Sequence, residues 1–455
     1  MRIMDDPRDQ RIAELEAENA ELRRRIAQLE HQVQTFLQRR KRTKGQRQPR
    51  QGTPDDRRRQ EHRTHPGVFR PDPPPGTVFI EHEVHPTQCS HCGSSKLDDT
   101  GKFEDHIVAD IPEPKLEWHR YRRHVHRCRD CERTCQGRGD LELPGAHIGP
   151  RARLLTCYGR AHLGISLGKT RDLLHDFFGL TVSRAGLLGH LHWGGNLFEP
   201  VVEELLERLR NSPVVQGDET GWRINGKTAW AWCFRDPKLA IFLIDHHRSR
   251  DVIKRALGES FAGTLVSDFY AAYHGLDCPK QRCLVHLLRE LAKLREELPA
   301  ASVRTFIQPL IVLMQDAIQL GKDRAGLTQK AFAEERQKIH DRFDDLILGC
   351  RSQNPDCVRI WKRLFKHCDE LFTFLDDPRV PADNNGCERD IRSLAAARND
   401  GGVHRAEWSA AAFARIKSVI VTSLKNGVRF INYGLDVVRA KLKGDKLPLP
   451  LAQTI

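Results

Sequence analysis

The chain has 455 residues, of which 39% are hydrophobic and 30% are charged, and its formal net charge at pH 7 is +13. This composition is typical of a globular protein of two or three domains. The basic excess favours a phosphate-bearing partner, because lysine and arginine release condensed counterions when they neutralise phosphates. No apolar run matches a signal peptide or a membrane span, which makes the cytoplasm the expected compartment.

The thirteen cysteines are spread along the chain, and their odd number leaves at least one unpaired. This distribution argues against a disulfide framework and favours metal ligands or buried thiols. Four isolated cysteines are interpreted as small buried hydrophobic residues. They are Cys157, Cys233, Cys350 and Cys368.

Residues 1–38 carry a heptad repeat. One seam position holds Ile12, Asn19, Ile26 and Val33, and the other holds Leu15, Leu22, Leu29 and Phe36. Branched residues at the first position and leucine at the second predict a parallel dimeric coiled coil, in which the asparagine sets the register. A single amphipathic helix packed on its own chain is the alternative.

Residues 39–76 are rich in Arg, Lys, Gln, Pro and Asp and have almost no apolar side chains. Such a segment cannot bury enough surface to fold, so the sequence predicts a basic disordered linker. Its charge suits a segment that lies along a DNA backbone, and it equally suits a solvated linker.

Residues 77–147 contain two C-x2-C pairs, Cys89 with Cys92 and Cys128 with Cys131, separated by strand-like sequence. Two such pairs are what a tetrahedral Zn2+ ribbon needs, since each presents two thiolates from a tight turn. Metal binding would then supply much of the stability of this short segment. His85, His91 and Cys135 lie nearby, and surface or supporting roles are favoured for them.

Residues 148–211 have a helical pattern in which two helices meet at a turn near Gly179, with Thr181 or Ser183 as a candidate cap. This outline fits a helix-turn-helix that reads a DNA groove. It fits ordinary helical packing as well.

Residues 212–285 predict three antiparallel strands, a helix over 250–257 and a fourth strand after Gly263. We interpret this order as the first part of a ribonuclease-H-like α/β catalytic core. A helical insertion follows over 286–380, and the last part of the core, over 381–435, has a helix that begins near Asn384 and carries Glu388. Residues 436–455 are expected to form a C-terminal tail.

Asp218 is predicted on the first strand, Asp268 at the end of the fourth, and Glu388 on the later helix. Three carboxylates converging from separate elements suit Mg2+ or Mn2+, which prefer oxygen ligands and assist phosphodiester displacement. Each residue alone also has an ordinary interpretation. The aspartates could end turns, and Glu388 is spaced for a helical ion pair with Arg392.

Four segments together resemble the IS-66 family of bacterial insertion-sequence transposases. They are DETGW at 218–222, SDFYAAY at 267–273, RCLVHLLRE at 282–290 and ADNNGCERDIRSLAAARN at 382–399. The order of the predicted segments also fits, so the resemblance covers nearly the whole chain. The NN-x2-ER motif is its most specific part.

The resemblance implies that Asp218, Asp268 and Glu388 take the metal-binding DDE roles. It also implies that four residues support the glutamate or contact DNA phosphates. They are Asn384, Asn385, Arg389 and Arg392.

His286 follows Cys283 by three residues, a spacing found after the second aspartate in similar transposase groups. It either hydrogen-bonds a phosphate near the scissile position or is an ordinary histidine at a helix N-terminus. Leu284 departs from the family, which often has an aromatic residue there, and this concerns local packing.

The reaction that the resemblance implies is hydrolysis of one strand at a transposon end, followed by attack of the freed 3′-hydroxyl on target DNA. The implied partners are double-stranded DNA, a second copy bound through residues 1–38, and small accessory proteins of the same element. We expect a bacterial, nucleoid-associated protein. A nuclease of the same fold without strand transfer and a domesticated DNA-binding protein are the alternatives.

Overall fold

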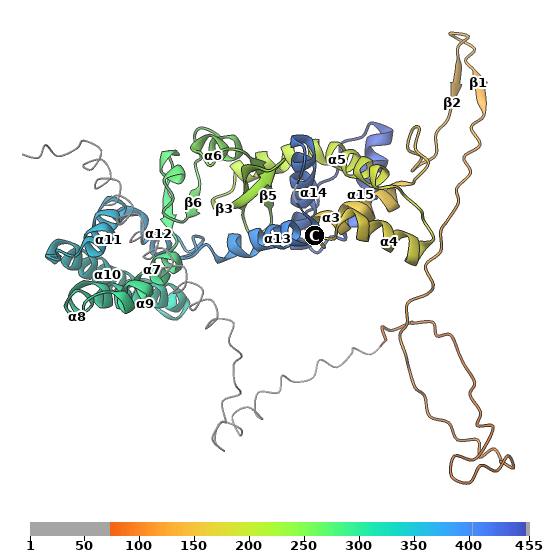
Figure 1. Cartoon of the computed structure of the whole chain (residues 1–455), viewed down its shortest axis with the longest axis horizontal. Coiled ribbons are helices and arrows are strands. Elements are labelled where there is room, and N and C mark those ends of the chain that lie inside the picture. The colour runs from red at the N-terminus through yellow and green to blue at the C-terminus, as the bar shows by residue number, and fades with distance from the viewer. Residues whose placement is uncertain (1–72, 403, 452–455) are drawn as a thin grey trace, which may run out of the picture. The chain divides into compact units, whose positions relative to one another are not determined.

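The computed structural model describes residues 73–402 and 404–451 of a chain that divides into two compact units, Met1–Val108 and Ala109–Ile455 (Figure 1). The predicted coiled coil of residues 1–38 lies outside the described residues. So does the predicted linker of 39–76, apart from its last four residues. We describe each unit by itself.

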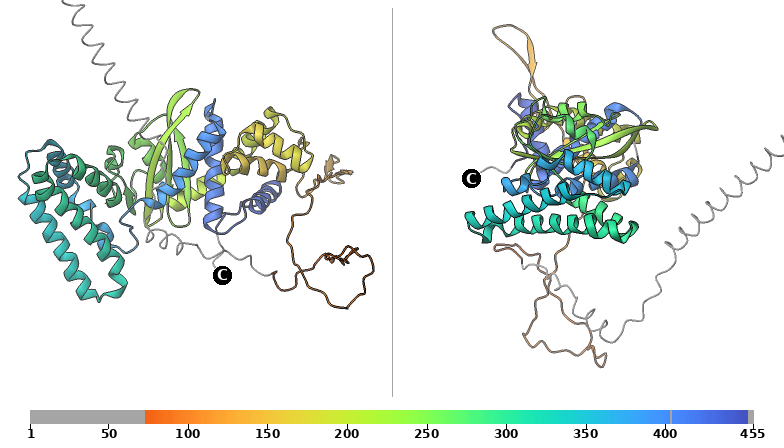
Figure 2. Two further views of the ribbon diagram at one scale, coloured as in Figure 1. Left: turned by 60° about the horizontal axis from the view of Figure 1, so that its bottom comes forward. Right: turned by 90° about the vertical axis from the view of Figure 1, so that its left-hand side faces the viewer.

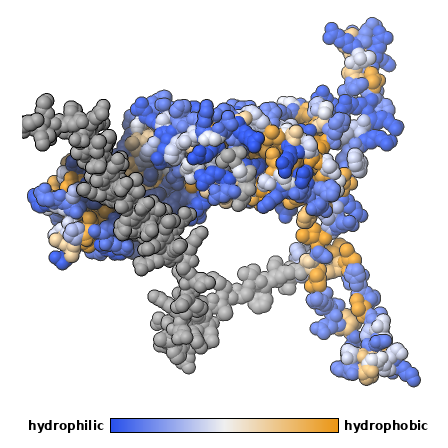
Figure 3. Space-filling view, in the orientation of Figure 1, coloured by the Kyte–Doolittle hydropathy of each residue, from blue (hydrophilic) through white to orange (hydrophobic). Residues whose placement is uncertain are grey.

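The described part of the first unit, residues 73–108, forms turns and contains no helix or strand. Large apolar side chains are exposed along it, including Val78, Ile80 and Phe103 at 93%, 85% and 89%. The space-filling view shows apolar side chains scattered along this extended segment (Figure 3). The described part of this unit therefore contains strand-like sequence, but its backbone does not pair with any strand.

The second unit begins with a short antiparallel hairpin of β1 (Val125–Arg127) and β2 (Thr134–Gln136). Three helices follow: α3 (Pro150–Ala161), α4 (Leu167–Phe178) and α5 (Arg184–Arg210). Gly179 ends α4 in the left-handed conformation, and the Ser183 hydroxyl caps α5 by accepting from the Gly186 N–H. The predicted pair of helices joined at Gly179 is thus present, and Ser183 is the cap.

A mixed five-stranded sheet forms the centre of this unit. Its strands are β3 (Val214–Ile224), β4 (Lys227–Arg235), β5 (Ala240–Asp245), β6 (Thr264–Ser267) and β7 (Lys280–Arg282). Their spatial order is β5-β4-β3-β6-β7. The strands β3, β4 and β5 pair antiparallel, whereas β6 and β7 run parallel to β3. Helix α6 (Arg250–Leu257) connects β5 to β6.

Helix α14 (Glu407–Lys425) covers the free edge of β5. The hydroxyl of Ser418 accepts from the Phe242 N–H at 2.8 Å, and that of Thr422 accepts from the Ala240 N–H at 3.2 Å. An open strand edge would otherwise pair with other chains, so these hydroxyls close the sheet. Helix α13 (Asn385–Gly401) packs on β3 and β4.

The predominantly helical region that follows β7 builds most of a separate hydrophobic cluster. Its helices are α7 (Leu284–Glu297), α8 (Ala300–Ser302), α9 (Gln308–Asp323), α10 (Gln329–Gly349), α11 (Pro355–Lys366) and α12 (Thr373–Asp376). The longer of these helices lie side by side in Figure 2, where they are coloured from green to teal. The region predicted as a helical insertion over 286–380 is predominantly helical, and its first helix starts two residues earlier, at Leu284.

The predicted C-terminal tail of 436–455 begins inside a helix. Helix α15 (Phe430–Lys443) buries Val437 and Val438 and packs on α3, because its apolar residues recur with helical spacing. Among the four isolated cysteines, Cys157 and Cys233 are fully buried, whereas Cys350 and Cys368 are only partly buried. In the described part of the chain, no helix has both the length and the apolar content that a bilayer span requires.

Candidate active site

Asp218 lies on β3, and Asp268 directly follows the neighbouring parallel strand β6. Strand β3 pairs with β6 from Val214 opposite Thr264 to Gln216 opposite Val266. Continued by two residues, this register sets Asp218 beside Asp268 at the end of β6, where adjacent strands are about 4.8 Å apart. The two aspartates therefore occupy the same edge of the sheet, as the sequence led us to expect.

Glu388 enters from the first turn of α13, whose start is tied to β3. The buried amide of Asn384 donates to the carbonyl oxygen of Gly217 at 2.8 Å, and the amide of Gln216 donates to the Asp383 carbonyl at 3.0 Å. A Cβ at Gly386 would lie 1.9 Å from the Arg235 guanidinium and 2.5 Å from the Gln216 side-chain oxygen, so a larger residue would displace these two side chains. The turn that carries Glu388 is thereby held against the residue that precedes Asp218.

Negative charge accumulates at this edge. Burial, together with the negative charges of three neighbouring carboxylates, raises the pKa of Asp218 to about 7. They are Glu219, Asp268 and Glu388. A half-buried aspartate whose anionic form is opposed by several like charges is typical of a cation-binding or catalytic position.

Two arginines and a histidine surround Glu388, which is 8% exposed. Arg289 of α7 and Arg392 of α13 each approach its carboxylate to 3.2 Å, and the His286 Nε2 lies 3.6 Å away. Arg289 was not among the predicted site residues, although it lies in the RCLVHLLRE motif. Its guanidinium is about half exposed and is thus accessible from solvent.

The remaining predicted supporting residues lie differently. Arg389 is exposed on α13, next to Glu388. Asn385 is half-buried, and its backbone N–H bonds to the Asp383 carboxylate at 2.9 Å. Of the four predicted supporting residues, Arg392 contacts Glu388 directly, and Asn384 holds the start of α13 through its bond to Gly217.

A fourth carboxylate, Glu219, was also missed by sequence reasoning. Its side chain is 2% exposed, accepts from the Tyr273 hydroxyl, and pairs with Arg248 at 2.6 Å. The guanidinium of Arg248 also lies over the rings of Trp230 and Tyr270, at 4.4 and 3.9 Å from their centres. The sequence feature that could have identified Glu219 is the pair of adjacent acidic residues inside an apolar strand. At least one of the two must be buried, and a buried carboxylate needs a partner.

Asp268 is held through its backbone and its carboxylate. The Tyr270 N–H donates to its side chain at 2.9 Å. Arg282, which is fully buried on β7, donates to its carbonyl oxygen at 2.8 Å and also binds Glu370. Glu370 belongs to the helical region, so Asp268 is connected to that region through one arginine.

Metal ligands were predicted at the three carboxylates and at the four ribbon cysteines. Within residues 73–402 and 404–451, no three acidic, histidine or cysteine side chains are grouped closely enough to hold one ion. The carboxylates nevertheless interact electrostatically, as the raised pKa of Asp218 reflects.

Each cysteine pair forms its own turn. The Cys89 N–H bonds to the Ser94 carbonyl, and the Cys128 N–H bonds to the Arg133 carbonyl, both at 2.8 Å. The pKa of Cys89 is lowered by the backbone N–H groups of His91 and Cys92, and that of Cys128 is lowered in the same way within its own turn. Cys89 and Cys92 belong to the first unit, and Cys128 and Cys131 to the second. Lowered pKa values favour the thiolate form that binds metals.

Comparison with known families identifies the chain. Residues 148–412 match the transposase IS66 family, and this region contains the sheet, the helical region and α13. The chain belongs to the IS66 family of transposases. Residues 86–132 also match the zinc-finger binding domain of transposase IS66, which covers both C-x2-C pairs. The resemblance noted from four short motifs is thus confirmed.

Relatives of this IS66 chain occur in Sinorhizobium fredii. The uncharacterized protein y4qI is 26% identical over 55% of this chain and 52% of its own length. The uncharacterized protein y4jD is 24% identical over 81% of this chain and 76% of its own length. The chain thus spans about half the length of the first relative and three quarters of the second.

Proposed function

We propose that this IS66-family chain is a DDE transposase that cleaves DNA at transposon ends and joins them to target DNA. The observation that carries the proposal is the register of β3 with β6, which sets Asp218 beside Asp268 while α13 brings Glu388 to the same edge. The raised pKa of Asp218 supports a site designed to receive positive charge.

The strand order supports a ribonuclease-H-like core. Three antiparallel strands are followed by a helix and two parallel strands, and the first parallel strand lies beside β3 at the centre of the sheet. In this proposal the region of α7 to α12 is an insertion between the second aspartate and the glutamate. That assignment explains why the residues of one site are far apart in sequence.

The donor set fits a hard divalent cation, since carboxylate oxygens are the ligands that Mg2+ and Mn2+ prefer. Asp218, Asp268 and Glu388 would hold it. When bound, such an ion stabilises negative charge on the attacking and leaving oxygens of a phosphodiester.

The chain's own residues position the substrate. Arg289 and Arg392 stand beside Glu388 with guanidinium groups that are more than half exposed, and guanidinium groups bind phosphate oxygens through paired hydrogen bonds. His286 adds a third donor. These three groups would orient a DNA backbone across the carboxylates, and Arg389 extends the basic face along α13.

Other parts of the chain would grip and pair the DNA ends. We propose Zn2+ at Cys89, Cys92, Cys128 and Cys131, groove contacts by α4 and α5, and self-association through residues 1–38. Small proteins from the same element are proposed accessory partners.

A strand-transfer assay on donor ends tests the proposal. The Asp218→Asn, Asp268→Asn and Glu388→Gln variants should each lose cleavage by several orders of magnitude while binding the same duplex with unchanged Kd. Asp344→Asn, an exposed α10 substitution, is the matched control and should retain activity. Normal cleavage by any triad variant would contradict the assignment. Cleavage without joined product would make the chain a nuclease, and binding without cleavage would make it a domesticated DNA-binding protein.

A further inference from the structure

The ion pair of Glu219 and Arg248 is asymmetric in its exposure to solvent. The Glu219 side chain is 2% exposed, whereas that of Arg248 is 35% exposed. The pair of Arg282 and Glu370 has the opposite arrangement, with a fully buried arginine and a carboxylate that is 24% exposed. In the pair at Glu219, it is therefore the guanidinium that reaches the solvent.

Glu219 holds one edge of this guanidinium. Arg248 donates from Nε at 3.0 Å and from Nη2 at 2.6 Å, both to the same oxygen of Glu219, whose other oxygen accepts from the Tyr273 hydroxyl. The Nη1 group donates to no residue that the structure describes. Because the donors of a guanidinium lie in one rigid plane, fixing one edge also fixes the direction of the other donors.

Two aromatic rings hold the guanidinium from its faces. The Arg248 carbon Cζ lies over the rings of Trp230 and Tyr270, and the contact with Tyr270 is the closer one. Cation–π contacts attract an arginine without using its hydrogen-bond donors. The Nη1 group thus remains available to a ligand while the side chain is held in place.

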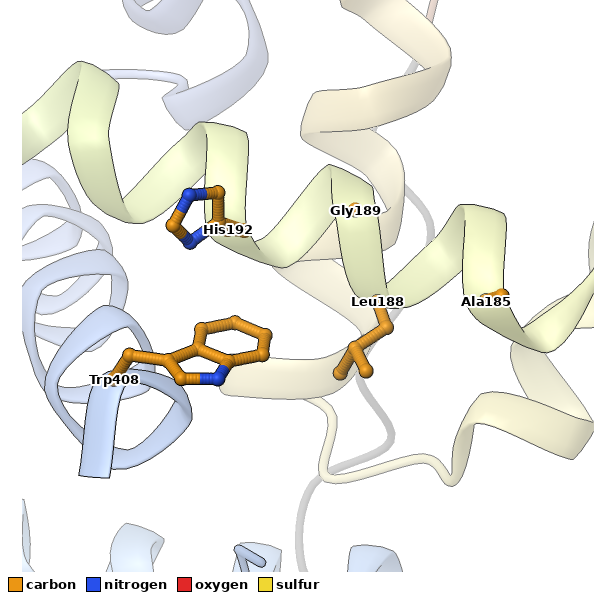
Figure 4. A pocket seen from close by; sticks show the side chains of 5 residues that line it. All are labelled: Ala185, Leu188, Gly189, His192 and Trp408. Carbon is orange, nitrogen blue, oxygen red and sulfur yellow. The ribbon is translucent and has the colours of Figure 1, made fainter. Parts of the chain in front are cut away.

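An exposed aromatic ring alone does not supply such a site. In Figure 4 the indole of Trp408 faces α5 across a shallow apolar pocket, whose other lining residues are Ala185, Leu188, Gly189 and His192. Among the described residues, no lysine or arginine lies over this indole. The rings of Trp230 and Tyr270 differ because they carry a cation.

Tyr270 connects Arg248 to Asp268. The Tyr270 N–H donates to the Asp268 carboxylate at 2.9 Å, and its hydroxyl donates to the Arg248 carbonyl oxygen at 2.7 Å. Burial lowers the pKa of Arg248, but the bond to Glu219 and nearby negative charges, Asp268 among them, raise it overall. Arg248 therefore lies near Asp268 and keeps its positive charge.

We propose that Arg248 binds a DNA phosphate on the Asp268 side of the carboxylate edge, and that Glu219 is a positioning residue that holds the guanidinium for this contact. The inference rests on the proposed function, which brings a DNA backbone to that edge. Arg289 and Arg392 stand beside Glu388, so Arg248 gives the backbone a second point of attachment. Phosphate contacts of this kind fix the register of a duplex without reading its sequence.

Salt-dependent binding of the donor-end duplex tests this proposal on the full chain without divalent metal, so that no strand is cut. Arg248→Met should raise Kd about tenfold and reduce the slope of log Kd against log salt concentration by about one, because one phosphate contact is lost. Arg248→Lys keeps the charge and should keep the slope. Arg342→Met is the matched control and should leave the slope unchanged, because Arg342 of α10 forms an exposed pair with Asp316.

A neutral phosphate analogue locates the contact. Replacing single phosphates near the cleavage position by methylphosphonate should weaken wild-type binding about tenfold at one position. Arg248→Met should bind the charged and neutral duplexes equally at that position. Glu219→Gln should keep the salt slope, since Arg248 remains charged, but should spread the penalty over neighbouring phosphates, since the guanidinium is no longer held.

The paired variant Glu219→Gln/Arg248→Met separates this role from a role in folding. It removes both charges, so no buried carboxylate is left without its cation. It should match Arg248→Met in its salt slope and in its response to methylphosphonate. A wild-type slope and a wild-type response in both variants would overturn the proposal. An equal loss of affinity at every phosphate position would overturn it too, because Arg248 would then act only through the fold.

The outcome is separable from the proposed catalysis, because binding is measured without metal. If Asp218→Asn still cleaves DNA, the triad assignment fails, while the coupling of Arg248 to a phosphate stands. If Arg248 shows no coupling to any phosphate, this inference fails and the triad assignment is unaffected.

Discussion

Arg282 donates a hydrogen bond of 2.8 Å to the carbonyl oxygen of Asp268 while its Nε binds Glu370. The same guanidinium contacts the Ser267 hydroxyl at 3.1 Å. A fully buried arginine thus joins the end of β6 to the helical region. Its positive charge is balanced by one carboxylate, that of Glu370.

Replacing this arginine should be costly. Arg282→Met leaves the Asp268 carbonyl without this donor and leaves Glu370 with only the His367 ring, at 3.0 Å, and breaking a buried pair costs about 3–5 kcal/mol. Urea unfolding measures the loss. Arg336→Met is the control, because Arg336 and Asp376 form an exposed pair whose removal should change stability by less than about 1 kcal/mol. An equal effect of the two substitutions would refute the structural role of Arg282.

The raised pKa of Asp218 predicts a pH-dependent stability difference. The pKa of this carboxyl is near 3.8 in the unfolded chain and about 7 in the folded protein. As pH rises between these values, the charged carboxylate lowers the stability of the folded protein by a growing amount. Asp218→Asn removes that penalty. The variant should therefore gain stability relative to the metal-free wild type between pH 5 and pH 8, by about 1–4 kcal/mol, since one pKa unit corresponds to about 1.4 kcal/mol.

Chemical unfolding at both pH values, with divalent metal removed from the buffer, measures this change. Asp344→Asn, at an exposed position on α10, should show no such trend. A stability difference for Asp218→Asn that is independent of pH would contradict the raised pKa.

Two glycines of α5 should respond oppositely to alanine. Gly195→Ala places a Cβ 2.7 Å from the Ala412 Cα, which forces α5 and α14 apart and should cost about 1–3 kcal/mol. Gly189→Ala places its Cβ in open space and should stabilise the helix by about 0.5–1 kcal/mol. Thermal unfolding compares them. A shift of Tm in the same direction for both would show that the helix contact is not as close as described.

The cysteine pairs should control the zinc content of the purified chain. Serine at Cys89, Cys92, Cys128 or Cys131 should each remove the bound zinc, because a structural site needs four ligands. Elemental analysis after gel filtration gives the zinc to protein ratio. Cys135→Ser, an exposed substitution in β2, is the control and should keep the metal. Zinc retained after any of the four substitutions would remove that cysteine from the ligand set.

Much of the sheet could be predicted because its signals are local. The turn between β3 and β4 is Asn225-Gly226, both with positive φ, at 48° and 74°, as a two-residue hairpin requires. Strand β7 could not be predicted, since Lys280, Gln281 and Arg282 are all polar. It forms because Gln281 bonds to Leu371 and Phe374, about 90 residues away.

The site divides in the same way. Asp218 lies within β3, Asp268 directly after β6 and Glu388 in the first turn of α13, and each position alone has an ordinary interpretation, so it was the family resemblance that singled these residues out. The contact between Arg289 and Glu388 joins residues 99 positions apart, and helical periodicity only reports which face Arg289 occupies. Glu219 was missed because its partners are distant in sequence: Arg248 precedes α6, and Tyr273 lies in the 3-10 helix Ala271–Gly275 after β6.

The bond from Asn384 to Gly217 has a consequence for synthesis of the chain. It spans 167 positions, so the ribosome must release most of the helical region before α13 reaches β3. Closing so large a loop makes docking of α13 a late folding event. A nascent or prematurely terminated product would carry both aspartates without the glutamate, and so would lack one of the three carboxylates of the proposed site.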